Sequence, residues 1–559
     1  MTGVVKSARC GTCRDRKVKC DEVKPVCGPC QKGKRICKAP ISKVKFARPK
    51  GLSAGVVHGS EGLIEPLSQI SIVRSISTTE GCNFQTMRLG RRRRAPERMA
   101  NPDADDHLPL LRRASLSPVQ PLQLALLESF RLAHAGLRLS VLAGFMEDVP
   151  RMLGHSTAFD DSIACLVNCH NLILHGQRPA GNRKQGNLYA KALLSLQAAL
   201  TDPVESYSDL TLGAVTILGN VEVFGGGSAI PQNVQHAGGA CKLIEMRGPG
   251  RVKSDLAKIL YMTQRAQGVS NQILKGTSDV VTVAMLRNEE TFFNAPEWRE
   301  ISFTDVYDRD TDCIIDEVLR EFTALPSLLV KIRAYYFSPD ERKSYAIYLE
   351  VLRLRKSVGL VADFVDQKLT NGFDIVEGPP MFGDGFLPST YQFSTMQLSH
   401  LCTFYWGLSI IINTIIARFL PANTPSSTLN GLQDQCLLAR QRILMSCEYA
   451  QQFRPFGTMY LAAPLMMAYD GATPEEKTWI IHQLWQIGEL MADVEVVWSR
   501  ISVEYASKFF YGEPIVLPGG QASSDPLDMR GGAFIKRVQE QIERLSIDER
   551  VISREGRNG

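Results

Sequence analysis

Six cysteines near the N-terminus follow one spacing twice. They are Cys10, Cys13, Cys20, Cys27, Cys30 and Cys37, which gives Cys-x2-Cys-x6-Cys, six residues, and the same triplet again. The second triplet repeats the first at an offset of 17 residues, although the whole 559-residue chain holds only 14 cysteines. Closely and regularly spaced thiolates are typical ligands of a structural metal ion, and zinc prefers four of them in a tetrahedron.

Six thiolates suffice for two zinc ions when two of them bridge. Two tetrahedral ions need eight ligand positions, which four single and two bridging cysteines fill. The repeat makes the first cysteine of each half the expected bridge. One ion then binds Cys10, Cys13, Cys20 and Cys27, and the other binds Cys27, Cys30, Cys37 and Cys10. We therefore expect two Zn2+ ions per chain as the cofactor.

Other chemistries fit this stretch less well. A disulfide framework needs an oxidising compartment, and residues 1–9 contain no apolar signal-peptide core. The run from Gly28 to Arg35 nearly spells a phosphate-binding P-loop. However, Arg35 stands where Ser or Thr should hold magnesium, and no apolar strand precedes the run. A zinc module that contacts protein instead of DNA stays open as an alternative.

The cysteine stretch resembles the fungal zinc binuclear-cluster (Zn2Cys6) DNA-binding domain, whose pattern it matches at all six cysteines. The resemblance implies a short helix and an extended segment in each half. It also implies that the first helix enters the major groove of double-stranded DNA and reads a CGG-type triplet. Arg16 and Lys17 fall where the family places its base-reading basic pair, from which a cation donates to guanine O6 and N7.

Basic side chains are concentrated around these cysteines. Arg14, Lys19 and Lys24 are expected at DNA phosphates, which orient a protein without specifying sequence. Residues 1–50 contain fifteen basic and three acidic side chains, a net charge of +12, whereas residues 51–559 have a net charge of −6. This asymmetry indicates a nucleic-acid-binding arm on a mildly acidic body.

The sequence divides into four parts. We expect a Zn2Cys6 module at residues 1–39, a flexible linker at 40–115, a large all-helical domain at 116–515 and a tail at 516–559 with an amphipathic helix over 534–545. The linker contains Arg91, Arg92, Arg93 and Arg94, a candidate nuclear-import signal or DNA-backbone contact. No apolar heptad persists in it, so a coiled-coil dimer is not predicted, and a homodimer stays open.

Helical periodicity dominates the body. We expect helices over 122–149, 160–175, 187–200, 210–224, 234–246, 313–337, 340–368, 396–420, 432–452 and 474–508. The fold class is therefore mostly α. The run from His236 to Pro249, with Tyr405-Trp406 and the segment 459–467, resembles the fungal-specific transcription-factor regulatory domain. Gly248 followed by Pro249 predicts a helix stop, and Arg247 beside it is expected to cap the helix, with a role as a buried ion-pair partner as the alternative.

Two segments of the body invite other interpretations. Residues 401–420 are long and apolar enough for a membrane span, but Asn413 and Arg418 favour a buried core helix, and no membrane partner is predicted. Cys165, Cys169, His170 and His175 suggest a further metal site. Their spacing scatters them around one helix, which favours ordinary core and surface roles.

These features predict a nuclear, sequence-specific DNA-binding regulator of RNA polymerase II transcription. A metabolic or biosynthetic gene cluster is a candidate target, and transcription machinery or co-regulators are candidate partners. The alternative is a transcriptional co-regulator that uses the zinc cluster for protein contact. The sequence contains no His-Glu-x-x-His and no complete P-loop, so we do not expect an enzyme.

Overall fold

The structure is a computed structural model of the 559-residue chain. It describes residues 119–513 with gaps at 143, 226–238, 241, 267–289, 302–309, 382–384 and 490–497. Near the N-terminus it describes residues 12–13, 16, 18–21, 27–33 and 35. The linker at 40–115 with Arg91–Arg94, and the tail at 516–559, lie outside the described residues.

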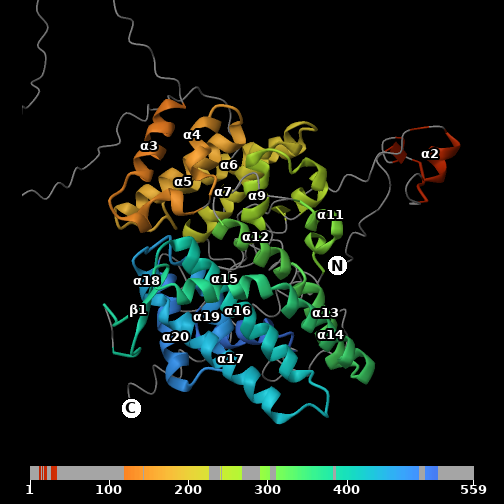
Figure 1. The fold of residues 1–559 in the computed structure, drawn as a ribbon. Helices are drawn as coiled ribbons and strands as arrows, with labels where there is room; N and C mark the ends of the chain where they lie inside the picture. The colour runs from red at the N-terminus through yellow and green to blue at the C-terminus, as the bar shows by residue number, and fades with distance from the viewer. Residues whose placement is uncertain are drawn as a thin grey trace, which may run out of the picture.

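The first half of the body is a group of packed helices, shown from orange to yellow-green in Figure 1. They are α3 (Gln120–Phe130), α4 (Val149–Met152), α5 (Thr157–Leu174), α6 (Arg183–Thr201), α7 (Asp209–Gly225) and α9 (Asp255–Ala266). Helix α5 packs against both α6 and α7, and α7 packs against α9. Ser156 and Asn182 begin α5 and α6, because each side chain accepts a backbone N–H of the first turn.

The second half is also helical and is green to blue in Figure 1. Its helices are α11 (Pro296–Arg299), α12 (Asp310–Phe322), α13 (Leu325–Phe337), α14 (Glu341–Ser357), α15 (Gly359–Thr370), α16 (Met396–Arg418), α17 (Ser426–Met445), α18 (Cys447–Gln451), α19 (Ala462–Tyr469), α20 (Pro474–Ile487) and α22 (Arg500–Phe509). The expectation of a mostly α fold is confirmed for the described residues. The sequence of Thr473, Pro474 and Glu476 predicts a capping box at the start of a helix, and α20 begins with that capping box.

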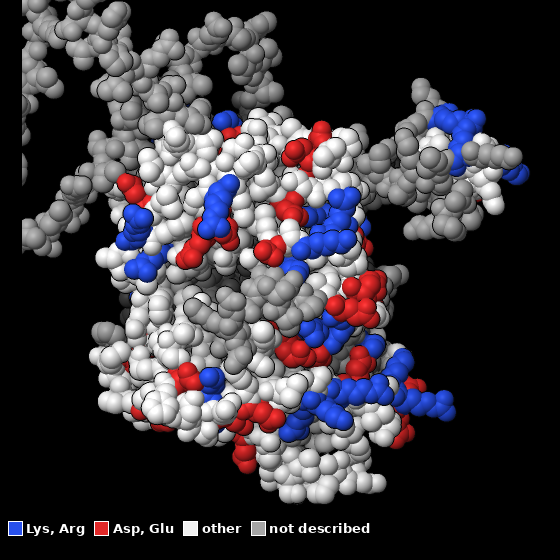
Figure 2. Space-filling view, turned by 45° about the horizontal axis from the view of Figure 1, so that its top comes forward, with Lys and Arg blue, Asp and Glu red and all other residues white. Residues whose placement is uncertain are grey.

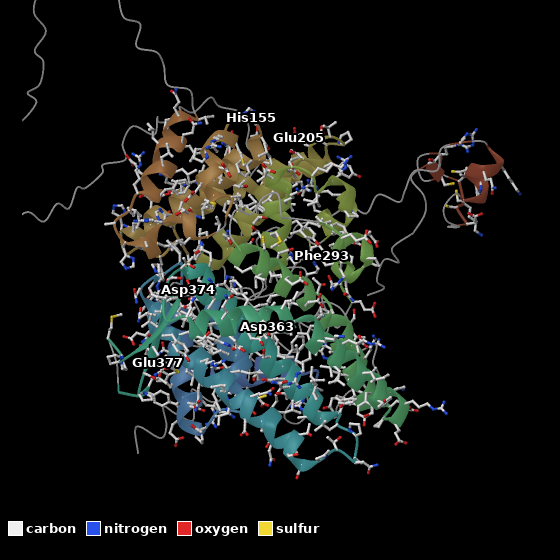
Figure 3. The ribbon with its side chains drawn as sticks, viewed as in Figure 1. His155, Glu205, Phe293, Asp363, Asp374 and Glu377 are labelled. Atoms are coloured by element: carbon white, nitrogen blue, oxygen red, sulfur yellow. The ribbon has the colours of Figure 1, made fainter. Side chains whose placement is uncertain are left out.

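A short antiparallel hairpin interrupts the helices, so the prediction of an all-helical body is wrong at this point. Strand β1 (Ile375–Gly378) pairs with β2 (Thr390–Phe393), with Ile375 opposite Phe393. Asp374, which Figure 3 labels beside Glu377, accepts hydrogen bonds from Lys368 at 2.8 Å and from Ser394 at 3.0 Å. The bond from Lys368 is the main cause of the lowered pKa of the Asp374 carboxyl. Four-residue strands have too few residues for a convincing alternation in the sequence.

Helix α16 is the core of the second half. It contacts α12, α14, α17 and α19, and side chains are buried on nearly all of its faces. It is long and apolar enough to cross a membrane by length and composition, yet 72% of its most apolar window is buried inside the body. The prediction of a buried core helix is thus confirmed.

The expected helix over 122–149 is wrong beyond Phe130. One-turn 3-10 helices follow α3, and Pro150 stands in the first turn of α4 instead of ending a long helix. The physical reason is a tertiary contact at Gly136. A Cβ there would lie 2.2 Å from the backbone oxygen of Arg454, and Phe456 N–H donates to the Gly136 carbonyl at 3.2 Å. A continuous helix would separate these two segments.

The region around Gly248 confirms one expectation and corrects another. Residues 242–247 are helical, and Gly248 has a φ of 72°, the left-handed conformation that suits glycine after a helix. Arg247 does not serve as a simple cap. It is buried, forms an ion pair with Asp209 of α7, and donates to the Ser208 carbonyl at 3.4 Å. The partner lies 38 residues away, so local sequence gives no sign of it.

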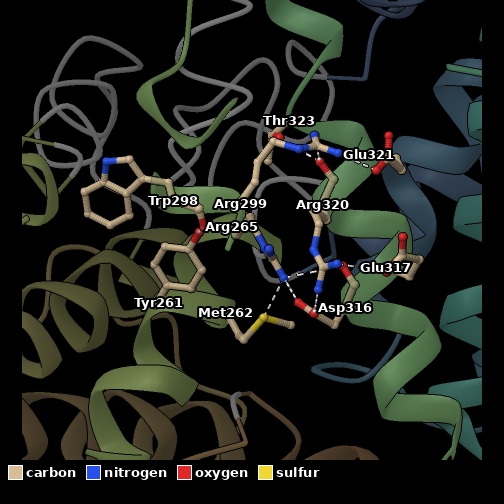
Figure 4. Close-up of polar contacts among 10 residues, drawn as sticks. All are labelled: Tyr261, Met262, Arg265, Trp298, Arg299, Asp316, Glu317, Arg320, Glu321 and Thr323. Carbon is tan, nitrogen blue, oxygen red and sulfur yellow. Dashed lines mark hydrogen bonds and ion pairs between the residues drawn. The ribbon is translucent and has the colours of Figure 1, made fainter. Parts of the chain in front are cut away.

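A buried ionic cluster joins the two halves (Figure 4). Arg265 of α9 is 1% exposed and pairs with Asp316 of α12, whose other oxygen lies 2.7 Å from Arg320. Arg299 of α11 pairs with Glu321 and donates to the Arg320 carbonyl at 3.0 Å. The buried Asp316 thus balances two guanidinium groups, that of Arg265 in the interior and that of the partly exposed Arg320. An unpaired buried charge costs several kcal/mol.

Replacing Asp316 tests this cluster. Asp316→Ala is expected to lower the free energy of unfolding by about 3–5 kcal/mol, because it leaves Arg265 buried without its counter-charge. The control is Glu350→Ala, which breaks the exposed Lys331–Glu350 pair (2.7 Å) and should cost less than about 1 kcal/mol. Chemical denaturation of the full chain measures both. Equal losses would show that the cluster is no more important than a surface pair.

Candidate metal centre

Cysteine side chains gather at the centre of the N-terminal module. The Sγ atoms of Cys13, Cys20 and Cys27 all lie within 4.8 Å of one another. Cys13 Sγ is 3.6 Å from Cys27 Sγ and 3.9 Å from Cys30 Sγ. All four residues are buried, and the sulfur atoms of the module lie beside α2 (Gly28–Lys32) in Figure 3. Sequence positions 14 to 17 residues apart are therefore brought to one point.

The donor set and its spacing fit zinc. A zinc ion bound by four thiolates at about 2.3 Å has neighbouring sulfurs about 3.8 Å apart. The Cys13–Cys27 distance agrees with such a tetrahedral edge. Cys13 and Cys30 belong to different proposed ligand sets, so their 3.9 Å separation is a contact between the two sets and not an edge of one tetrahedron. Cys13, Cys20 and Cys27 are three of the four cysteines assigned above to the first ion. Cys10 and Cys37, which complete the two sets, lie outside the described residues.

The backbone repeats with the cysteines. Val18 N–H donates to the Cys13 carbonyl at 3.0 Å, and 17 residues later Arg35 N–H donates to the Cys30 carbonyl at 3.0 Å. A second pair of bonds, in the turn before each of these, keeps the same offset: residue 16 to residue 12 at 3.2 Å, and residue 33 to residue 29 at 3.3 Å. The two halves thus share one local conformation, which presents equivalent cysteines to a common centre.

Asp21 has a positioning role that the spacing of the cysteines does not reveal. Its carboxylate accepts the Gly28 N–H at 2.9 and 3.1 Å, at the first residue of α2. A Cβ on Gly28 would lie 2.5 Å from the Asp21 oxygen, so the close contact depends on glycine. Asp21 therefore fixes the second half against the end of the first. In the sequence, the only sign of this role is that Asp21 is an acidic residue in a strongly basic stretch.

The structure describes two of the five basic residues that are predicted to contact DNA. Arg16 and Lys19 are exposed, as are Lys32 and Arg35 of the second half. Figure 2 shows Lys and Arg side chains on the surface of this module. Arg14, Lys17 and Lys24 lie outside the described residues. The metal ligands thus face inward, whereas the described cations face solvent, where a polyanion has access to them.

The cysteines and histidines on α5 have other partners. Cys165 and Cys169 are buried, and burial raises the pKa of both thiols, that of Cys165 to about 12. His170 is buried with a ring nitrogen 2.7 Å from the Leu137 carbonyl, and burial lowers its pKa. His175 ends the helix in an exposed position. These are the core and surface roles that the spacing predicts.

Gly51-Leu52-Ser53-Ala54-Gly55 has the Gly-x-Ser-x-Gly spelling of a hydrolase nucleophile elbow. That elbow requires an apolar strand before the serine and a helix after it. The residues that precede it, Ala47-Arg48-Pro49-Lys50, are basic and contain proline, which is unlike such a strand. The segment lies outside the described residues, and its sequence context gives no support for a catalytic serine.

Comparison with known proteins gives one short match. Over 28 residues at the N-terminal end, the chain is 68% identical to the C6 finger domain transcription factor hasF of Aspergillus fumigatus. The match covers 5% of this chain and 4% of the length of that relative. No family model and no solved structure matches the chain. The similarity is therefore confined to one segment of the two proteins.

Substitution of Cys27 tests the metal centre. Cys27→Ala is expected to remove at least half of the zinc that copurifies with the full chain, because this fully buried thiol belongs to both proposed ligand sets. Cys436→Ala, in α17 of the body, is the matched control and should keep its zinc. Elemental analysis and non-denaturing mass spectrometry measure the content. Wild-type zinc in the Cys27 variant would contradict the assignment.

Proposed function

We propose that this chain is a nuclear, sequence-specific DNA-binding regulator of RNA polymerase II transcription. The observation that carries the proposal is the group of buried cysteines, with zinc-like spacing and a 17-residue repeat, below exposed cations. The similarity to a C6 finger transcription factor at this end of the chain supports it. The large helical body follows this small DNA-binding module in the chain.

Two zinc ions bound by Cys10, Cys13, Cys20, Cys27, Cys30 and Cys37 are part of the proposal. When bound, the metal supplies the folding free energy that a module of this size lacks, because few apolar side chains are present to form a core. Among the described residues, Val18 is the partly buried hydrophobic that packs against the cysteines. The protein's own contribution is to hold the thiolates together and to turn its cations outward.

The basic residues divide into two roles. Arg16 and Lys17 are proposed to donate to guanines of a CGG-type triplet in the major groove. Arg14, Lys19 and Lys24 are proposed to contact phosphates, which supply the salt-dependent part of the affinity. The exposure of Arg16 and Lys19 is consistent with both roles. The net charge of +12 on residues 1–50 attracts DNA, whereas residues 51–559, with a net charge of −6, do not.

We also propose where the chain acts and what it contacts. Arg91, Arg92, Arg93 and Arg94 are the candidate nuclear-import signal. A metabolic or biosynthetic gene cluster is a candidate target. A co-regulator that uses the zinc cluster to contact protein is the second candidate function, and direct DNA binding separates the two. The side chain of Arg16, exposed next to the cysteines, favours DNA because phosphates and guanines both accept from guanidinium groups.

Two lysine variants test how DNA is read. Lys17→Ala should lose about 1–3 kcal/mol of binding free energy on a CGG-containing duplex and little on a scrambled duplex. Lys24→Ala should weaken binding to both duplexes alike and reduce the slope of log affinity against log salt by about 1. Fluorescence anisotropy with the full chain at several salt concentrations measures both effects.

The opposite results would reject the roles or the function. The same loss on both duplexes for both variants would contradict the division into base and phosphate contacts. If the wild-type chain did not prefer the CGG duplex to the scrambled one at any salt concentration, the co-regulator would become the better hypothesis.

A further inference from the structure

A cavity of about 490 Å3 lies between α14, α15, α16 and α17 in the second half of the body. This volume falls in the range of sites for small organic molecules, roughly 300–1,000 Å3. The cavity is far in sequence from the cysteine module, and no step of the proposed DNA binding uses it. The chemistry of its walls indicates what kind of molecule it accepts.

Polar side chains of α16 are collected on the cavity wall. Tyr405, Ser409 and Asn413 line the cavity at intervals of four residues, which places them on one stripe of the helix. The rest of α16 is dominated by buried apolar side chains. Asn413 is 5% exposed and donates to Gln435 of α17 at 3.2 Å. An otherwise apolar helix thus presents a built polar face to the cavity.

The charges around the cavity favour an anion. Arg355 of α14 and Arg442 of α17 line it, opposed by the single carboxylate of Asp366 in α15. Asp366 is 68% exposed, and its oxygen lies 3.9 Å from the Arg442 guanidinium. Such an exposed and distant pair neutralises little of the charge. Arg355 donates to the neutral Gln435 amide oxygen at 3.0 Å.

Two residues that line the cavity, Trp406 and Arg442, each carry one buried nitrogen donor without a partner among the described residues. Trp406 is 1% exposed, and its Nε1 has no hydrogen-bond partner among the described residues. The Nε of Arg442 is also buried without a hydrogen-bond partner in this part of the chain. Both groups donate and cannot accept. The guanidinium of Arg442 lies 5.8 Å from the centre of the Trp406 ring, so the two donors belong to one region. Both nitrogens are fully buried and do not face the cavity, so the preference for an anion rests on the guanidinium charges of Arg355 and Arg442.

The remaining wall is apolar, with Val358, Ile412 and Leu438 beside the Trp406 ring. We propose that this cavity binds a small organic carboxylate with an apolar or aromatic body, its carboxylate toward the guanidinium groups of Arg442 and Arg355 and its body against the aliphatic wall. The site is independent of the proposed DNA function. Its test therefore uses no DNA.

Three matched probes test the chemistry: 2-naphthoate, 2-naphthalenemethanol and 2-naphthylmethylamine, which share a ring system and differ in charge. Isothermal titration calorimetry with the full chain measures each affinity. The carboxylate should bind about tenfold or more tightly than the alcohol, because a charge-assisted hydrogen bond replaces a neutral one. The ammonium probe should bind more weakly than either.

Variants locate the binding. Arg442→Met should reduce 2-naphthoate affinity about tenfold and leave the alcohol nearly unchanged. Arg353→Met, an exposed arginine of α14 that does not line the cavity, is the control and should change neither. Asp366→Asn removes the competing carboxylate and should tighten 2-naphthoate binding about twofold to fivefold. This gain is not an effect that a misfolded protein produces.

The proposal is rejected if the three probes bind alike or if none binds at about 1 mM. It is also rejected if Asp366→Asn fails to tighten carboxylate binding, or if Arg442→Met and Arg353→Met have the same effect. None of these results bears on zinc content or on DNA preference, so failure here leaves the proposed function standing.

Discussion

Burial of α16 is the constraint on which the body depends. A 23-residue helix with apolar side chains on nearly every face is stable in water only when other helices enclose it. Helices α12, α14, α17 and α19 supply that enclosure. The crossing with α19 is close because Gly407 has no side chain: a Cβ there would lie 2.6 Å from Met467 Sδ. Because burial of apolar surface is the main source of stability, the packing of these four helices around α16 determines how the helices of the second half are arranged.

The cysteine module meets the opposite constraint. It has few apolar residues, and among those described only Val18 packs on the sulfurs. A domain this small does not bury enough surface to offset its conformational entropy. In the proposed function, metal–thiolate bonds replace the missing core, and the backbone repeat and the Asp21–Gly28 contact hold the two halves that carry the cysteines. The chain would then use two different sources of stability, a hydrophobic core and a metal centre.

Sequence reasoning succeeded where the signal is local. The cysteine spacing, the Thr473 capping box and the Gly248 stop depend on residues within a few positions of each other, and the structure contains the latter two as predicted. It failed where distant segments decide. The helix break after Phe130 follows from the contact of Gly136 with Arg454, and the ion pair of Arg247 from the position of Asp209. The two strands of the hairpin have four residues each, which is too few for an alternation of apolar and polar side chains to be recognised in the sequence.

The same limit explains why the wall of the cavity escaped notice. In the sequence, Asn413 served only as evidence against a membrane span, because a single amide in an apolar segment does not indicate what it binds. The structure places it in a stripe with Tyr405 and Ser409, facing Arg442 and Gln435 from another helix. The Ser409 hydroxyl donates to the Tyr405 carbonyl at 2.8 Å and Asn413 donates to Gln435, so hydrogen bonds within the protein hold this polar stripe in place. With the guanidinium of Arg442 on the facing helix, this polar stripe forms the wall at which the proposed carboxylate binds.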